Sequence, residues 1–180
     1  RRMNVFFLDK NPQLAAEYHH DKHVVKMILE TAQLLSTAHR VIDGEQYIDQ
    51  STGRKIKRWK MNDSFMEERL YKATHMNHPS NVWARESKDN YVWLYCLFVS
   101  LCNEYTHRYG KVHATCTKLA DILSQPPRNI KDTGLTKMPQ AMPDIYRCDD
   151  SVEAYRAYYK GAKKDQSKYT KRNQPVWLNT

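Results

Sequence analysis

The clearest pattern of apolar and polar positions lies in residues 21–40, DKHVVKMILETAQLLSTAHR. On a helix with about 100° per residue, its apolar side chains cover an arc of roughly 220°, which predicts a mostly buried helix. The remaining arc is one narrow polar stripe, and His39 alone among the long polar residues falls on the apolar side. The stripe holds Lys22, His23, Lys26, Glu30, Gln33, Thr37 and Arg40.

Two interpretations of this stripe are open. Lys26 and Glu30 are four residues apart, as in an ordinary ion pair on a solvated helix face. Alternatively, a carboxylate and two ammonium groups on an otherwise enclosed helix line a cleft, where burial and mutual charge shift their pKa values. The choice depends on what the rest of the chain brings to the stripe.

The same periodicity predicts further helices and one short β-like run, at residues 4–8. Asn11 and Pro12 start a brief helix. The second long helix, residues 88–109, ends at Gly110 and is the expected main packing partner of the first. The other predicted helices span 64–74, begin at Pro79, and span 112–123 and 152–164, with Asp21, Asp63 and Ser151 as N-caps.

Two segments interrupt the helical pattern. Residues 41–62 contain the turn signals Asp43-Gly44 and Thr52-Gly53, which predict a small β-hairpin excursion. Residues 125–150 are rich in proline and predict a long loop. We therefore expect a mainly α protein, one compact helical domain over residues 1–180 with a short β-like segment at its start.

The composition favours a polyanionic partner. Lys and Arg total 29 against 20 Asp and Glu, which gives a net charge of +9. A basic balance of this size is typical of nucleic-acid-binding proteins, although it also serves solubility. Twelve Tyr and four Trp add surfaces for base stacking. A chain that is 41% hydrophobic and 27% charged with five Gly is not a disordered one.

The second arm of the predicted hairpin is the most basic stretch. Five cations and one tryptophan in seven residues suit phosphate contacts combined with base stacking. The alternative is a solvated edge strand that its lysines protect from aggregation. The candidate nucleic-acid-binding residues are Arg54, Lys55, Lys57, Arg58, Trp59 and Lys60.

Two more polar clusters are candidate walls for a cleft. The segment HMNHPSNVWARES, residues 75–87, starts a helix at Pro79 and predicts an anion-binding corner, unless caps and packing use its side chains. The exit of the second long helix collects cations that also favour the negative end of a helix dipole. With Gln33 and Arg40, the candidate substrate-binding residues are His75, Asn77, His78, Trp83, Arg85, Asn90, Arg108, Lys111 and His113.

Cysteine and histidine usage gives little sign of a metal site. Cys96, Cys102, Cys116 and Cys148 lack CxxC spacing, so we expect them reduced and structural. A crowded histidine junction, residues 19–23, permits an HD-type metal site, but such sites need further ligands from later helices. We expect no cofactor.

No stretch reaches the roughly 18 apolar residues that a membrane span requires, and the start has no long apolar signal region. We take Met3, after Arg1 and Arg2, as the natural start. The expectation is a cytoplasmic protein without a membrane partner, whose oligomeric state the sequence leaves open.

Four segments carry a resemblance that covers nearly the whole chain. They are AAEYHHDKHVVKMILETAQLL, NHPSNVWARES, EYTHRYGKVH and AYRAYYKGAKK. With the short N-terminal strand, they resemble a family of small phage and bacterial proteins grouped with the pyrimidine-dimer DNA glycosylases of the phage endonuclease V type.

The resemblance implies a small, basic, almost entirely helical enzyme with a catalytic glutamate about seven residues after a histidine. His23 and Glu30 match that spacing. The family also uses the α-amine of its mature N-terminus to form a Schiff base, and this chain departs there, because Met3-Asn4 is a poor start for methionine removal. A lysine would then supply the amine, and Lys22 and Lys26 are the candidates.

Three functional hypotheses follow. The first is a nucleic-acid-acting enzyme, a DNA base glycosylase or related base-modifying enzyme, in which Glu30 is the general acid or base and the base is flipped from the duplex. The second is a non-catalytic DNA- or RNA-binding protein that uses the basic arm. The third is a metal-dependent phosphohydrolase built on His19, His20, Asp21 and His23.

Overall fold

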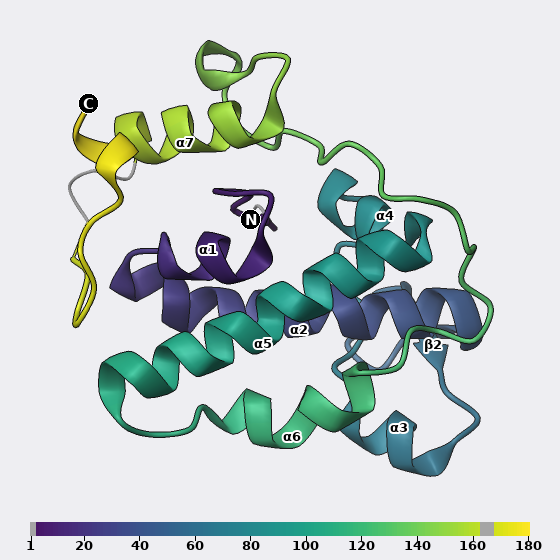
Figure 1. Cartoon of the computed structure of the whole chain (residues 1–180). Helices are drawn as coiled ribbons and strands as arrows, with labels where there is room; N and C mark the ends of the chain where they lie inside the picture. The colour runs from purple at the N-terminus through teal and green to yellow at the C-terminus, as the bar shows by residue number, and fades with distance from the viewer. Residues whose placement is uncertain (1–2, 163–167) are drawn as a thin grey trace.

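The computed structural model describes residues 3–162 and 168–180. These residues form a mainly α structure with one small antiparallel sheet, which confirms the predicted fold class (Figure 1). The elements are α1 (Pro12–Glu17), α2 (Asp21–Asp43), β1 (Glu45–Asp49), β2 (Ile56–Lys60), α3 (Ser64–Arg69), α4 (Pro79–Glu86), α5 (Lys88–Tyr109), α6 (Ala114–Leu123) and α7 (Ser151–Ala162), with 3-10 turns at Asp144–Tyr146 and Val176–Asn179.

Helices α2 and α5 form the centre of the protein, as predicted, and lie across one another in Figure 1. Ile28 and Leu35 of α2 and Leu94 and Phe98 of α5 are fully buried. Helices α1, α4 and α6 pack around this pair.

Helix α2 is buried on a different arc from the one that its sequence predicts. Val25 and Leu29 are each 38% exposed, whereas Glu30, Thr37 and Arg40 from the polar stripe are buried. Its N-cap is His20, whose side chain accepts a hydrogen bond from the backbone N–H of His23, so the expectation of Asp21 as the cap was wrong. The helix has neighbours over its polar stripe, and these bury side chains that periodicity assigns to the surface.

The N-terminal run is extended but is not a strand. Residues 4–8 form no ladder with another segment, and Val5, Phe6 and Leu8 are buried. The apolar run is β-like because it enters the core, where it meets α2 and α7 side chains such as His23 and Tyr155. The helix start that follows it is confirmed, because Asn11 caps α1 and Pro12 is its first residue.

The predicted hairpin is present. Strands β1 and β2 are antiparallel, with Glu45 opposite Lys60 and Asp49 opposite Ile56. Helix α2 continues through residues 41–43 and is capped by Gly44, just before the hairpin, where a Cβ atom would overlap the carbonyl oxygen of Arg40. The close approach of the backbone explains why glycine occupies this position.

Helix α3 ends five residues earlier than its pattern predicts. The cause is the Arg40 guanidinium, which donates to the carbonyl oxygens of Glu67 (3.1 Å), Leu70 (2.8 Å) and Tyr71 (2.7 Å). These bonds satisfy carbonyl groups at the end of the helix and hold the chain in an extended turn. Phe65 in its first turn is exposed.

Helices α5 and α6 follow their predicted boundaries closely, whereas the predicted end of the last helix, at residue 164, lies outside the described residues. Helix α5 spans its predicted residues and ends at Gly110, which has φ 69° in the left-handed region that glycine tolerates. Helix α6 begins two residues late, at Ala114. The cap of α7 is Asp150, whose side chain accepts from two backbone N–H groups, and Ser151, the expected cap, donates instead to the carbonyl oxygen of Met138.

The predicted proline-containing loop crosses the protein as an ordered strap between α6 and α7 (Figure 1). Asn90 of α5 holds it by exchanging hydrogen bonds with Thr136. Beyond α7, Trp177 packs against Tyr18 and Tyr159 and so fixes the C-terminal segment to the body of the protein.

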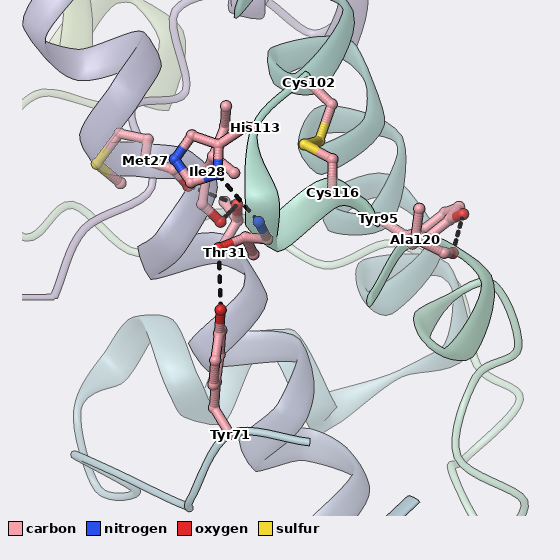
Figure 2. The surroundings of a disulfide bond; sticks show 10 residues. Met27, Ile28, Thr31, Tyr71, Tyr95, Cys102, His113, Cys116 and Ala120 are labelled. Atoms are coloured by element: carbon pink, nitrogen blue, oxygen red, sulfur yellow. Dashed lines mark hydrogen bonds between the residues drawn. A yellow bond between two sulfur atoms is a disulfide. The ribbon is translucent and has the colours of Figure 1, made fainter. Parts of the chain in front are cut away.

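A disulfide bond joins α5 to α6, so the expectation of four reduced cysteines was wrong. Cys102 and Cys116 are bridged, with their Cα atoms 6.1 Å apart (Figure 2). The turn after Gly110 brings the two residues together across 14 positions, a spacing that carries no local signal. Cys96 and Cys148 are free and exposed.

We predict that this bridge stabilises the fold. Closing a loop of this length reduces the entropy of the unfolded chain and contributes about 3 kcal/mol. Reduction, or the double variant Cys102→Ser with Cys116→Ser, should lower the free energy of unfolding in urea by about that amount. Cys96→Ser is the matched control and should change little. A urea midpoint unaffected by reductant would show that the two thiols are not bridged in solution.

Candidate functional site

Glu30, the carboxylate of the polar stripe, is enclosed by the protein. It is 1% exposed, and its Oε2 lies 3.6 Å from Nζ of Lys26, one helical turn earlier. The Lys26 side chain is 54% exposed, and Lys22 is also exposed. Each of the two interpretations of the stripe thus holds for part of it. The carboxylate of Glu30 is enclosed, whereas the ammonium groups of Lys22 and Lys26 are in solvent. Gln33, the next polar residue of the stripe, is half-buried.

The histidine junction forms a packed aromatic cluster. His23 stacks on Phe6 at 4.2 Å and shares a 2.8 Å hydrogen bond with the Tyr159 hydroxyl, and His20 stacks on Tyr159 at 5.1 Å. His19 shares a 2.6 Å hydrogen bond with the carbonyl oxygen of Ala15. Burial lowers the pKa of His19 to about 3, which keeps its ring neutral.

This packing is unfavourable for the phosphohydrolase hypothesis. The described residues contain no group of three His, Cys, Asp or Glu side chains placed to hold a metal ion. Asp21, the expected metal partner, instead accepts hydrogen bonds from Arg108 (3.0 Å) and from the hydroxyl of Thr170 (2.6 Å).

Arg108, predicted to bind substrate, is part of a buried charge network. Its fully buried guanidinium donates to Glu104, Asp21 and the carbonyl oxygen of Glu17. Arg172 from the C-terminal segment pairs with Glu104 at 2.9 Å. Because its guanidinium is buried and donates to oxygens of the protein itself, Arg108 has a structural role.

Burial alone would raise the pKa values of both carboxyls in this network. For Asp21, hydrogen bonds from Thr170 and Arg108 more than offset burial, so its pKa lies below the ordinary value. For Glu104, the hydrogen bond from Arg172 and the charge of Arg108 have the same effect. Both groups are therefore stabilised as carboxylates in the folded protein.

Arg40 and Asn90 also differ from their predicted roles. Arg40 donates to the carbonyl oxygen of Trp59 and to the carboxylate of Glu67, besides the α3 carbonyls, so all of its capacity is used inside the protein. Asn90 is buried and bonds the carbonyl oxygen of Trp83 as well as Thr136. Trp83 itself is buried, with its indole N–H on the carbonyl oxygen of Thr136. All three hold the strap or the hairpin in place.

In the turn that follows α5, Lys111 is exposed and His113 is half-buried. His113 caps α6 by accepting from the backbone N–H of Thr115 at 3.1 Å, and burial lowers its pKa. The Thr115 hydroxyl is in turn bonded to the Tyr71 hydroxyl at 2.9 Å. His113 thus belongs to the packing of α6 beside the disulfide.

The basic arm and the predicted corner meet in one hollow. It has a volume of about 650 Å³ and is lined on one side by residues 55–59 and on the other by residues 73–78. Lys55 and Lys57 are exposed there, as are the neighbouring Arg54 and Lys60. His75, Asn77 and His78 face the arm across the hollow.

Two residues of the arm have structural roles instead. Trp59 is 8% exposed, so its ring forms part of the floor and is not free to stack on a base, as the sequence had suggested. Arg58 donates to the carbonyl oxygen of Ala73 at 2.9 Å and lies 3.9 Å from Asp49. This bond ties the arm to the opposite wall and forms the hollow.

The opposite wall is tied to α2 and α4. The backbone N–H of Thr74 donates to the Thr37 hydroxyl of α2, and Asn81 of α4 donates to the carbonyl oxygens of Thr74 (2.8 Å) and His75 (2.7 Å). Thr37 and Glu30 are seven residues apart on one face of α2, which is roughly 10 Å along the axis. Sequence reasoning did not single out Asn81 or Thr74, because their role depends on this junction.

Arg85 is the one predicted substrate-binding residue of α4 that has no structural role in the described chain. It is half-buried, its Nη1 atom has no hydrogen-bond partner there, and burial lowers its pKa. His78 caps α4 by accepting from Ser80. Of the predicted corner, therefore, Arg85, Asn77 and His75 keep side chains available for a ligand.

Comparison with family models, with curated proteins and with solved structures finds no match for this chain. In the described residues, no helix is long and apolar enough to cross a membrane.

We predict that the Arg108 network makes stability depend on acid. Because the folded pKa values of Asp21 and Glu104 lie below their unfolded values, stability is present above the unfolded values and lost as pH falls through the folded ones. The free energy of unfolding should therefore decline below pH about 4. Urea unfolding measured at several pH values checks this.

Removing the central cation should reproduce the effect at neutral pH. Arg108→Met removes the buried cation that Asp21 and Glu104 share and should lower the free energy of unfolding by about 3 to 5 kcal/mol. Arg147→Met removes an exposed pair with Asp144 and should change it by under about 1 kcal/mol. Equal effects of the two substitutions would contradict the prediction.

Proposed function

We propose that the protein is a nucleic-acid-acting enzyme, with DNA favoured, that binds a strand along the basic hollow and releases a base as a glycosylase. The observation that carries the proposal is the hollow itself, where exposed lysines of β2 face the His75 to His78 wall. The basic arm and the 75–78 segment, which the sequence predicts as two separate binding elements, line one concave surface.

Binding rests on the exposed cations. Arg54, Lys55, Lys57 and Lys60 have no ion pair in the described chain that would compete with a phosphate. Side-chain ammonium groups on a concave surface neutralise backbone phosphates and release counterions, which supplies most of the affinity of such complexes. His75 and Asn77 are exposed on the other side and offer further hydrogen bonds.

Catalysis rests on Glu30. A carboxylate enclosed in the protein is suited to act as a general acid or base, because water does not compete for its proton. Glu30 lies on the same face of α2 as Thr37, which is bonded to the wall of the hollow. The wall of the hollow is therefore attached to α2 about two helical turns from this carboxylate.

The exposure of the lysines favours hydrolysis over a Schiff base. An amine nucleophile is activated by desolvation or by a neighbouring cation, and Lys26 and Lys22 are in solvent. Water activated by Glu30 would then attack the sugar carbon as the base leaves. The resemblance of the chain to pyrimidine-dimer DNA glycosylases agrees with a base-releasing reaction.

A non-catalytic nucleic-acid-binding protein is the second candidate. The same hollow supports it, and it requires nothing of Glu30. The two candidates differ in turnover, so they are separated by experiment.

We predict a steep salt dependence of duplex DNA binding. In a plot of log K against the logarithm of the salt concentration, each phosphate contact should contribute about −0.9 to the slope. Replacing Lys55, Lys57 and Lys60 by Gln should make the slope shallower by up to about 3. Titration of labelled duplex at several salt concentrations measures it.

The matched control removes the same charge elsewhere. Lys10, Lys118 and Lys131 are exposed and do not line the hollow. Their replacement by Gln should leave the slope nearly unchanged. An equal loss in both triple variants would mean that net charge, and not the hollow, attracts the DNA.

We predict that Glu30→Gln abolishes base release but not binding. Ultraviolet-irradiated and other base-damaged or hypermodified duplexes are incubated with the protein, and free base is measured directly. Loss of a general acid or base lowers the rate by about 10² to 10⁴. Glu153→Gln, an exposed position on α7, should keep full activity.

Borohydride trapping in the same assays tests the route. Hydrolysis predicts that base is released without a trapped adduct. If an adduct is trapped and Lys26→Gln removes it, the reaction proceeds through a Schiff base on Lys26 and not by direct hydrolysis. If no substrate yields free base or an adduct while duplex binding persists, the glycosylase proposal fails and the binding protein remains.

A further inference from the structure

Arg85 is unusual among the enclosed arginines of the protein. Arg40 and Arg108 are buried, and each is surrounded by carbonyl and carboxylate oxygens. Arg85 is half-buried, yet its Nη1 atom is covered without a hydrogen-bond partner in the described chain, and no carboxylate there pairs with it. A covered donor without a partner is unfavourable for folding, so this nitrogen is a candidate position for a ligand.

Asn81 supplies a second, independent observation. It is 1% exposed, and its Nδ2 group is fixed by the carbonyl oxygens of Thr74 and His75. That orientation leaves the Oδ1 atom buried without a partner in the described residues. A buried acceptor of this kind is rare in folded proteins.

The two groups lie on one face of α4, and Asn81 is bonded to the wall of the hollow. Residues four apart on a helix have Cβ atoms about 5 to 6 Å from each other. Asn81 bonds directly to two residues that line the hollow, so it lies behind the wall formed by residues 73–78, and Arg85 follows one helical turn later. That wall contains His75 at φ 49°, a left-handed conformation that is costly for a residue other than glycine.

We propose that Asn81 and Arg85 form a recognition pair for the edge of a nucleobase that leaves the strand bound in the hollow. A base edge presents a hydrogen-bond donor beside an acceptor, which matches the Asn81 Oδ1 acceptor and the Arg85 donors. A phosphate offers acceptors only, so it would satisfy Arg85 and repel Asn81. The strained wall is the part that moves aside when the base enters. This inference rests on the proposed function and adds the site that reads the base.

The test compares two single-stranded oligonucleotides with the same backbone charge. One has a mixed sequence, and the other carries tetrahydrofuran abasic residues at its central positions. The wild-type protein should bind the first about tenfold more tightly, since a hydrogen bond to a charged group is worth about that factor. Arg85→Met should bind both with the affinity of the abasic strand.

Arg147→Met is the matched control and should keep the tenfold preference, because Arg147 is exposed and pairs with Asp144. The thermal midpoint of Arg85→Met should equal or exceed that of the wild type, since an unpaired charge leaves the interior. If this variant has no thermal transition, Arg85→Gln replaces it, with the same loss of preference expected.

The outcomes separate the two levels of the proposal. If neither oligonucleotide binds, the proposed function fails. If the wild-type protein binds the two oligonucleotides equally well, nucleic-acid binding stands and the recognition pair is refuted. A buried water would then be the partner of Asn81 and Arg85. A preference that survives in a folded Arg85 variant also refutes the pair.

Discussion

The buried guanidinium of Arg108 is the interaction on which the arrangement of the helices depends. It binds the end of α1 through the carbonyl oxygen of Glu17, the start of α2 through Asp21 and its own helix α5 through Glu104. Asp21 and Glu104 extend the network to Thr170 and Arg172 of the C-terminal segment. A cation that is fully withdrawn from water is tolerated only when its donors are satisfied, so these four parts of the chain must meet at one place. Their meeting fixes the direction of α2 and, with it, the position of its polar stripe.

Arg40 plays the corresponding part at the other end of α2. Its bonds to the carbonyl oxygens of Trp59 and Leu70 hold the hairpin and the short α3 against the helix. The hairpin then lies where Arg58 can reach Ala73, and the basic hollow forms between them. The surface proposed to bind nucleic acid is therefore built by structural arginines, while exposed lysines provide its charge. This division has a physical reason, because a planar guanidinium satisfies several fixed carbonyl oxygens at once, whereas a flexible ammonium group remains hydrated.

The candidate site was partly predictable. The sequence nominates Lys55, Lys57, His75 and Arg85 from local clusters of charge and aromatic residues, and the structure leaves these side chains available for a ligand. The same kind of local pattern predicts Arg40, Asn90 and Arg108 as binding residues, but the side chains of all three form hydrogen bonds inside the protein. Nothing in the local pattern separates the two groups, because the oxygens that satisfy Arg108 come from positions as far as 91 residues away. Asn81 and Thr74 were missed for the same reason.

The sequence by itself determined the identity of most helices, the hairpin and several caps, such as Asn11, Asp63 and Gly110. These features depend on periodicity and on neighbours within a few residues, which the order of side chains specifies directly. Only the tertiary structure decided which face of α2 is buried, how the N-terminal run enters the core and that Cys102 meets Cys116. It also decided that Glu30 is enclosed while Lys26 is in solvent. Burial and pairing of this kind are set by segments far apart in the chain, and the energy of a charged group depends on those neighbours more than on its own position in a helix.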